Sequence, residues 1–194
     1  MYLDLIFTHD TWWLLQLLLL VEWSINRPDL SQFSYGGYLG GDERKHLRYV
    51  PNADHSLAGT DAISSVASYY YGTLNNIELP IYNFSAVYGD YGAQLTLTIK
   101  NGKKPTSVLL WEAFSNTRDF RVETIGKTWK STPVEINEEL TWTIFVKNPP
   151  SSGYLAFLLE MTFDKYFKIP ISLPLIFTTS TYIVPNTLPC KYPY

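Results

Sequence analysis

The second half of the chain is dominated by short segments in which apolar and polar residues alternate. Residues 94–99 (Gln-Leu-Thr-Leu-Thr-Ile) are the clearest example, because every second side chain would face a core while the others face water. We predict eight strands, at residues 81–87, 94–99, 108–114, 120–124, 132–136, 142–146, 154–163 and 175–184. Asn-Gly, Asn-Pro-Pro and Ser-Ser-Gly sequences between them supply turns. Short strands at this spacing, with no helical stretch, predict a β-sandwich of the immunoglobulin or fibronectin type.

The first 78 residues follow a different pattern. Residues 45–50 alternate like a short strand, and a helix is predicted from about residue 60 to residue 73. Thr60 and Asp61 offer oxygens that suit a helix N-terminus, and Gly72 with the Asn75-Asn76 pair should end the helix. Strand, turn and helix in this order are typical of the last unit of an α/β sheet. We therefore place a domain boundary near residues 75–80, which divides the chain into residues 1–78 and 79–194.

The apolar run at residues 14–21 (Leu-Leu-Gln-Leu-Leu-Leu-Leu-Val) does not distinguish helix from strand by its pattern. Leucine and glutamine favour a helix, whereas a strand buried on both faces of a parallel sheet would look the same. The run is too short to cross a bilayer and lacks the basic leader of a signal peptide. We therefore expect no transmembrane span here.

Composition narrows the classes of function. The formal net charge is −3 and there is no basic tract, so binding to nucleic acid is not expected. Cys190 is the single cysteine, which excludes an intramolecular disulfide and a four-cysteine zinc site. Asp54, His55 and Asp61 are weak candidates for metal ligands because no second histidine lies at ligand spacing. We expect neither a metal ion nor another cofactor, and we expect His46 to be a packing residue.

Several longer motifs resemble one known family. They are Pro-Asp-Leu-Ser-Gln-Phe at 28–33, Lys-His-Leu-Arg-Tyr-Val-Pro-Asn-Ala-Asp-His-Ser-Leu at 45–57, Arg-Asp-Phe-Arg-Val-Glu-Thr-Ile-Gly at 118–126, Trp129 with Ser-Thr-Pro at 131–133, and Val-Pro-Asn-Thr-Leu-Pro at 184–189. From about residue 14 to residue 189 the chain resembles the PhoPQ-activated pathogenicity-related proteins. That family is associated with virulence, peptide resistance or growth repression, whereas residues 1–13 match it poorly.

The resemblance implies an α/β plus all-β fold: the C-terminal remnant of an α/β-hydrolase domain, followed by an immunoglobulin/fibronectin-like β-sandwich. Residues 14–21 would be the penultimate strand of the hydrolase sheet, and residues 22–27 the loop that carries the triad acid. The family's Gly-Asp pair is absent from that loop, although Glu22 stands one residue away. We expect residues 14–21 to lie as a parallel strand beside residues 47–50.

His55 is the candidate catalytic residue, because the triad histidine of α/β-hydrolases lies in a loop after the last strand. There it would act as a relic general base, and the alternative is a histidine that only hydrogen-bonds Asp54 or the loop backbone. The sequence contains no Gly-x-Ser-x-Gly nucleophile elbow. The first hypothesis is therefore a catalytically incomplete fragment of a secreted protein that acts by recognition. The alternatives are a part of an active serine hydrolase or peptidase, and a gene remnant without function.

Asn83 begins the sequon Asn-Phe-Ser and is a candidate glycosylation site. By resemblance to secreted family members we expect an extracellular location, with a cell-surface protein or receptor as the partner. The aromatic residues of 69–71, Trp142 and Tyr154 either belong to the core or form a binding surface. The oligomeric state stays open.

Overall fold

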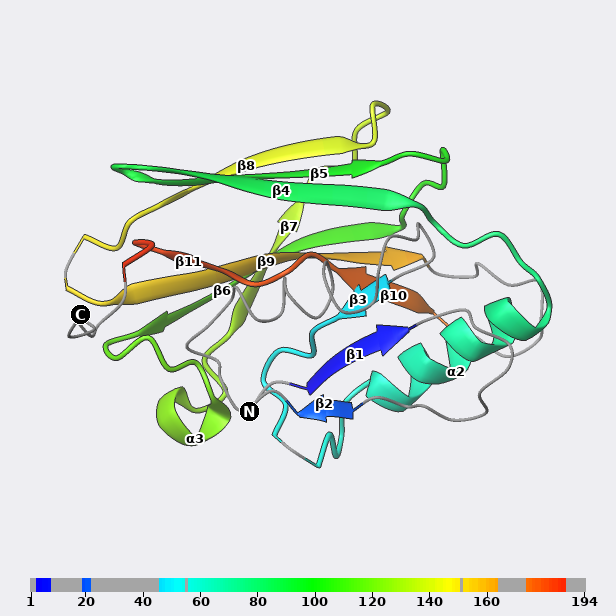
Figure 1. Cartoon of the computed structure of the whole chain (residues 1–194), viewed down its shortest axis with the longest axis horizontal. Helices are drawn as coiled ribbons and strands as arrows, with labels where there is room; N and C mark the ends of the chain where they lie inside the picture. The colour runs from blue at the N-terminus through cyan, green and yellow to red at the C-terminus, as the bar shows by residue number, and fades with distance from the viewer. Residues whose placement is uncertain are drawn as a thin grey trace, which may run out of the picture.

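The structure, a computed structural model, describes residues 3–7, 19–21, 46–54, 56–150, 152–163 and 174–187. Within these residues β-strands predominate, and every strand pair is antiparallel. One sheet has three strands, β4 (Tyr82–Gly89), β5 (Gly92–Ile99) and β8 (Thr141–Lys147). Figure 1 shows this sheet above a larger sheet, with a second small sheet and a helix below. The larger sheet is therefore the middle layer, and its two faces carry different parts of the chain.

The two sheets of the upper half contain all of the strands that follow residue 80. The smaller sheet has the order β4-β5-β8. The larger sheet has the order β10-β9-β6-β7, and β11 also pairs with β9. Its strands are β6 (Ser107–Ser115), β7 (Lys130–Val134), β9 (Tyr154–Phe163), β10 (Leu175–Thr178) and β11 (Tyr182–Val184). The strand-rich second half predicted from the alternation is confirmed.

The main core lies between these two sheets. Leu95 and Leu97 of β5 are fully buried, and so are Phe157, Leu159 and Met161 of β9 in the same cluster. These are the inward positions of alternating strands, because successive side chains point to opposite faces of a sheet. The alternation in the sequence thus places one face of each sheet in this core.

The other face of the larger sheet packs on the N-terminal part of the chain. Ala156 and Leu158 of β9 belong to a second cluster that also contains Leu47 and Tyr49. Six consecutive residues of β9, from 156 to 161, are buried, which requires cover on both faces of the strand. The N-terminal part and the strand-rich part therefore share the larger sheet as a common layer.

The N-terminal sheet corrects one expectation. Its order is β2-β1-β3, with β1 (Leu3–Phe7), β2 (Leu19–Val21) and β3 (His46–Arg48). Leu19–Val21 is indeed a strand, but it is not the parallel neighbour of β3, because β1 lies between them and pairs antiparallel with both. The alternating Leu-Asp-Leu-Ile-Phe sequence of β1 suits a strand, and its pairing separates the two strands that we expected to be adjacent. Residues 14–18 and 22–27 lie outside the described residues.

Helix α2 (Ala62–Leu74) ends at the Asn75-Asn76 pair, as predicted, but not at Gly72. Asn76 has a positive φ of 50°, and the backbone N–H groups of Asn76 and Ile77 donate to the carbonyls of Thr73 and Gly72. This is the Schellman arrangement, in which a left-handed residue closes the last helical turn. Gly72 itself lies inside the helix and is buried, so it does not stop the helix.

Asn76→Ala should lower the free energy of unfolding by about 1 kcal/mol, whereas Asn76→Gly should leave it unchanged or raise it slightly. The reason is the left-handed backbone at this residue, which disfavours a Cβ atom but suits glycine. Urea denaturation followed by circular dichroism measures both changes. If alanine and glycine destabilised the protein equally, the cause would be the loss of the Asn76 side-chain amide and not the backbone conformation, which would contradict this explanation.

Two predicted strands differ from the structure. Residues 120–124 were expected to form a strand, but Val122–Ile125 is the short helix α3. The carboxylate of Asp119 accepts hydrogen bonds from the backbone N–H of Arg121 (3.1 Å) and from the Thr124 hydroxyl (2.7 Å). Such local bonds from a side chain offer the backbone an alternative to a sheet ladder.

The predicted strand at 175–184 is divided into β10 and β11. Thr178 pairs with Glu160 and Tyr182 with Phe157, so three residues on one strand oppose two on β9. This one-residue excess is a β-bulge. At the bulge the Thr179 hydroxyl accepts from the backbone N–H of Leu159 at 3.0 Å, which replaces a ladder bond.

Candidate functional site

The loop between β3 and α2 holds the position predicted for a catalytic histidine. His55 itself lies outside the described residues, and its role stays a prediction. The residues on both sides of it are described. The Oδ1 atom of Asp54 accepts hydrogen bonds from the Ser56 hydroxyl (2.6 Å) and the Ser56 backbone N–H (2.8 Å), which lower the pKa of Asp54. The Asp54 carboxylate thus closes a local turn.

The same loop is attached to the larger sheet by Asn52. Its side-chain amide donates to the carbonyl of Trp129 at 2.9 Å and accepts from the backbone N–H of Trp129 at 3.0 Å. The amide therefore behaves like one residue of a neighbouring strand. Asn52 has a φ of 59°, a conformation that asparagine tolerates better than most residues. This pair of bonds fixes where the loop begins.

A charge network centred on a buried arginine connects three elements, and Asp61 is its partly exposed end. Arg48 of β3 is 2% exposed, and its guanidinium donates to Glu160 Oε2 of β9 at 2.5 Å. It also binds both carboxylate oxygens of Asp61, at 2.8 and 3.0 Å, directly before α2. Since Asp61 is held in this way, it makes no side-chain cap and the helix begins at Ala62 instead of near residue 60. The network joins the middle layer, the N-terminal strand and the helix.

This network was not predicted, although the sequence carries one signal for it. Glu160 stands within the otherwise apolar or neutral run of β9, Tyr-Leu-Ala-Phe-Leu-Leu-Glu-Met-Thr-Phe. A buried carboxylate requires a partner of opposite charge, so an arginine or lysine was to be expected opposite it. Nothing in the sequence shows that Arg48 is that partner, 112 residues away.

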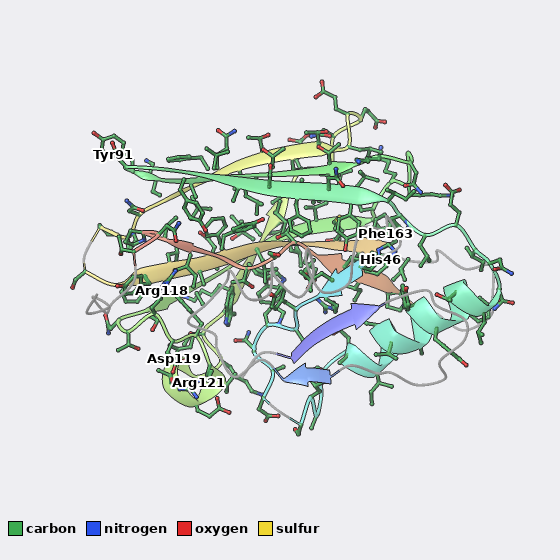
Figure 2. The ribbon with its side chains drawn as sticks, viewed as in Figure 1. His46, Tyr91, Arg118, Asp119, Arg121 and Phe163 are labelled. Carbon is green, nitrogen blue, oxygen red and sulfur yellow. The ribbon has the colours of Figure 1, made fainter. Side chains whose placement is uncertain are left out.

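His46 is confirmed as a packing residue. Its ring stacks on Phe177 with the centroids 4.3 Å apart and makes an edge contact with Tyr69. Burial lowers its pKa from 6.5 to about 3, so the imidazole is neutral at physiological pH. Figure 2 shows the residue in the interior, on β3. This histidine is thus part of the core.

The Arg-Asp-Phe-Arg motif at 118–121 forms a second polar cluster beside α3 (Figure 2). Arg118 is 1% exposed and stacks over the ring of Tyr154. Partial burial opposes ionisation of Asp119, but hydrogen bonds from Arg121 and Thr124 outweigh it and lower its pKa to about 2. Because Asp119 stays ionised and shares its charge with Arg121, the cluster serves to hold the turn.

The described residues contain no group of three or more His, Cys, Asp or Glu side chains that could hold a metal ion. Nor do they contain a helix long and apolar enough to cross a membrane. Of the aromatic candidates, Trp142 and Tyr69 are buried while Tyr70 is exposed. Asn83 is exposed on β4. The polar clusters of the described residues therefore act in positioning the chain, and its exposed apolar residues are the candidates for binding.

Comparisons with known proteins found a family model and a curated relative that match parts of this chain. The family model described as "PhoPQ-activated pathogenicity-related protein" matches residues 27–121. The chain is 32% identical over 179 residues to "Autocrine proliferation repressor protein A" of Dictyostelium discoideum. That alignment covers 84% of this chain and 36% of the relative, so the chain spans about a third of the length of the curated relative. No solved structure is significantly similar.

Proposed function

We propose that this chain, which belongs to the PhoPQ-activated pathogenicity-related family, acts outside the cell by recognising a protein partner and has no catalytic activity of its own. It combines the end of an α/β-hydrolase-like domain with an immunoglobulin/fibronectin-like sandwich. In support of the sandwich, β4, β5 and β8 correspond to strands A, B and E of that fold, and the larger sheet to its C, F and G strands. In support of the hydrolase part, the order along the chain is β3, then the loop with His55, then α2. An α/β-hydrolase ends in the same order, with its last strand, its histidine loop and its final helix.

The observation that carries the recognition role is an apolar stripe on the outside of α2. Ile63, Tyr70 and Leu74 are 81%, 58% and 62% exposed, and Ala67 is exposed between them. Their spacing of four, three and four residues places them on one helix face. Exposed apolar side chains are ordinary when scattered, but a contiguous stripe of large ones marks a surface that binds protein.

The opposite face of α2 explains why the stripe is outside. Ala62, Ser65, Ser68 and Gly72 are buried, and the Ser68 hydroxyl donates to the carbonyl of Pro174 at 2.8 Å. The helix can lie close to the chain beneath it because these side chains are small and the Ser68 hydroxyl is hydrogen-bonded to backbone carbonyls. Tyr69, Val66 and Tyr71 pack on the core. Ile63, Tyr70 and Leu74 are left exposed for a partner.

A growth assay tests this role. Purified chain added to Dictyostelium discoideum cultures should lengthen the doubling time, as the name of the relative suggests, and the variant Ile63→Asp/Leu74→Asp should not. Ser131→Asp/Thr132→Asp, which places the same two charges on exposed residues of β7, is the matched control and should act like the unchanged chain. An unchanged doubling time with the wild-type chain, or full activity of the α2 variant, would argue against the proposal.

The second candidate function is a share in an active serine hydrolase. It is favoured by the relative's greater length and by the place of His55 between β3 and α2. We expect the chain by itself to leave activated esters unhydrolysed, because its sequence has no Gly-x-Ser-x-Gly. Stoichiometric labelling by a serine-reactive fluorophosphonate probe, lost in His55→Ala, would support the hydrolase instead.

A further inference from the structure

The outer face of the smaller sheet carries three rows of side chains without a charge, flanked by the exposed lysines Lys100 and Lys147. Paired residues across β4, β5 and β8 form the rows Asn83–Thr98–Thr141, Ser85–Thr96–Thr143 and Val87–Gln94–Phe145. Hydroxyl and amide groups fill the first two rows, and the third adds the exposed side chains of Val87 and Phe145. In Figure 1 this face is the upper surface of the molecule, and no described element covers it.

The sequon Asn-Phe-Ser lies on this face. Asn83 and Ser85 are both exposed and point the same way, because they are two residues apart on β4, whereas Phe84 points toward the core. In the amide orientation that satisfies both neighbours, Asn83 Oδ1 accepts from Lys100 Nζ at 2.8 Å and Nδ2 donates to the carbonyl of Tyr82 at 3.0 Å. One of the two hydrogens on Nδ2 is left for substitution.

We propose that Asn83 carries an N-linked glycan and that this glycan lies along the outer face of the smaller sheet toward Phe145. The inference rests on the proposed extracellular location, since the transfer takes place in the secretory pathway. Asn83 Nδ2 forms a bond to the anomeric carbon of a lipid-pyrophosphate-linked oligosaccharide. The carbon–oxygen bond to the pyrophosphate breaks with its electron pair, and the displaced amide proton goes to a base of the transferase. Both hydrogen bonds of Asn83 remain possible in the product.

The chemistry of the face matches that of the glycan. From Asn83 the row of Val87 and Phe145 lies about 13 Å along the strand, and Phe145 is two strands across from β4. The diagonal of about 16 Å is a distance that a few linked sugar rings reach. Neutral hydroxyl and amide groups can exchange hydrogen bonds with sugar hydroxyls without having to desolvate a full charge. At the end of that path the exposed ring of Phe145 offers an apolar surface for the C–H face of a sugar. The glycan is therefore the occupant that the face suits, in preference to a second protein.

The first experiment locates the modification. The full chain is secreted from a eukaryotic cell line behind an added, cleavable signal, and peptide-N-glycosidase is expected to lower its mass and convert Asn83 to aspartate. Asn83→Gln and Ser85→Ala should abolish the mass difference, while Ser85→Thr, which keeps the sequon, should preserve it. A secreted wild-type chain without sugar at Asn83 would overturn the proposal. Fractionation of cells that express the chain without the added signal reports on the extracellular location separately.

The second experiment tests the position of the glycan. Removing it enzymatically from the folded chain should lower Tm by about 2–4 °C. In Phe145→Thr, a substitution that suits an exposed strand, the same treatment should lower Tm much less, because the sugar has lost its apolar surface. Tyr91→Thr, at the exposed tip of the β4–β5 hairpin (Figure 2), is the control and should behave like the wild type. An equal loss of Tm in the wild type and Phe145→Thr would show that the glycan does not lie on this face.

Discussion

Arg48→Met is expected to lower the free energy of unfolding by about 3–5 kcal/mol. The substitution keeps most of the length and apolar stem of the side chain but removes the charge that faces Glu160. Glu160 is 7% exposed, so its carboxylate would remain in the interior without its cationic partner. Chemical denaturation at neutral pH measures the loss.

Two further variants separate the charge from the packing. Arg48→Met/Glu160→Leu should recover a large part of the loss, because replacing a buried ion pair by apolar residues of similar volume is often close to neutral. Lys104→Met breaks the exposed pair with Glu138 and should change stability by less than about 1 kcal/mol. If the double variant is no more stable than Arg48→Met, the arginine stabilises through Asp61 or through packing, and the buried pair is not the cause.

His46→Phe is expected to remove much of the acid sensitivity of this protein. In the unfolded chain the imidazole binds a proton below its ordinary pKa of 6.5, whereas in the folded chain burial lowers the pKa to about 3. Between these values the unfolded state holds more protons, so stability is present above pH 6.5 and is lost as the pH falls toward 3. The slope from this residue approaches about 1.4 kcal/mol per pH unit, and over the whole window the loss is on the order of 5 kcal/mol.

Denaturant midpoints measured from neutral pH down to about pH 4.5, where most carboxylates remain ionised, isolate the histidine. Wild type should lose stability across this range, and His46→Phe should show a flatter profile, because phenylalanine preserves the stack on Phe177 without a titrating group. Tyr69→Phe, an aromatic neighbour of His46, is the control and should keep the slope of the wild type. Identical slopes in wild type and His46→Phe would mean that this residue is protonated in both states or in neither.

The parts of the fold that the sequence predicts are those with a local cause. The strand at 154–163 was predicted with its observed bounds. The end of α2 follows from Asn76, because asparagine tolerates the left-handed backbone that closes a helix. The errors have local causes of another kind. Asp119 turns a β-like sequence into a helical turn through its own side chain, and Thr179 breaks a strand by replacing a backbone acceptor.

The candidate site was predicted less well, because its contacts join distant parts of the chain. Residues 45–50 alternate like a short strand, a pattern that is typical of a strand with one face in water, yet residues 46–50 are all buried. Only the arrival of β9, more than a hundred residues later, covers the face that carries Arg48. Likewise, β1 lies between β2 and β3 in the sheet, and nothing in the sequence near those two strands indicates that β1 pairs with them. Pairing between remote segments has no periodic signature in a single sequence.

The burial of β9 on both faces has a consequence for how the chain loses its structure. Because Phe157 and Leu159 face one core and Ala156 and Leu158 the other, the strand cannot leave either core without opening both. The free energies of the two sequence regions are therefore coupled, and heating should melt them in one cooperative transition with a single heat-capacity peak. The boundary near residue 79 divides patterns in the sequence, whereas the unit that unfolds includes both sides of it.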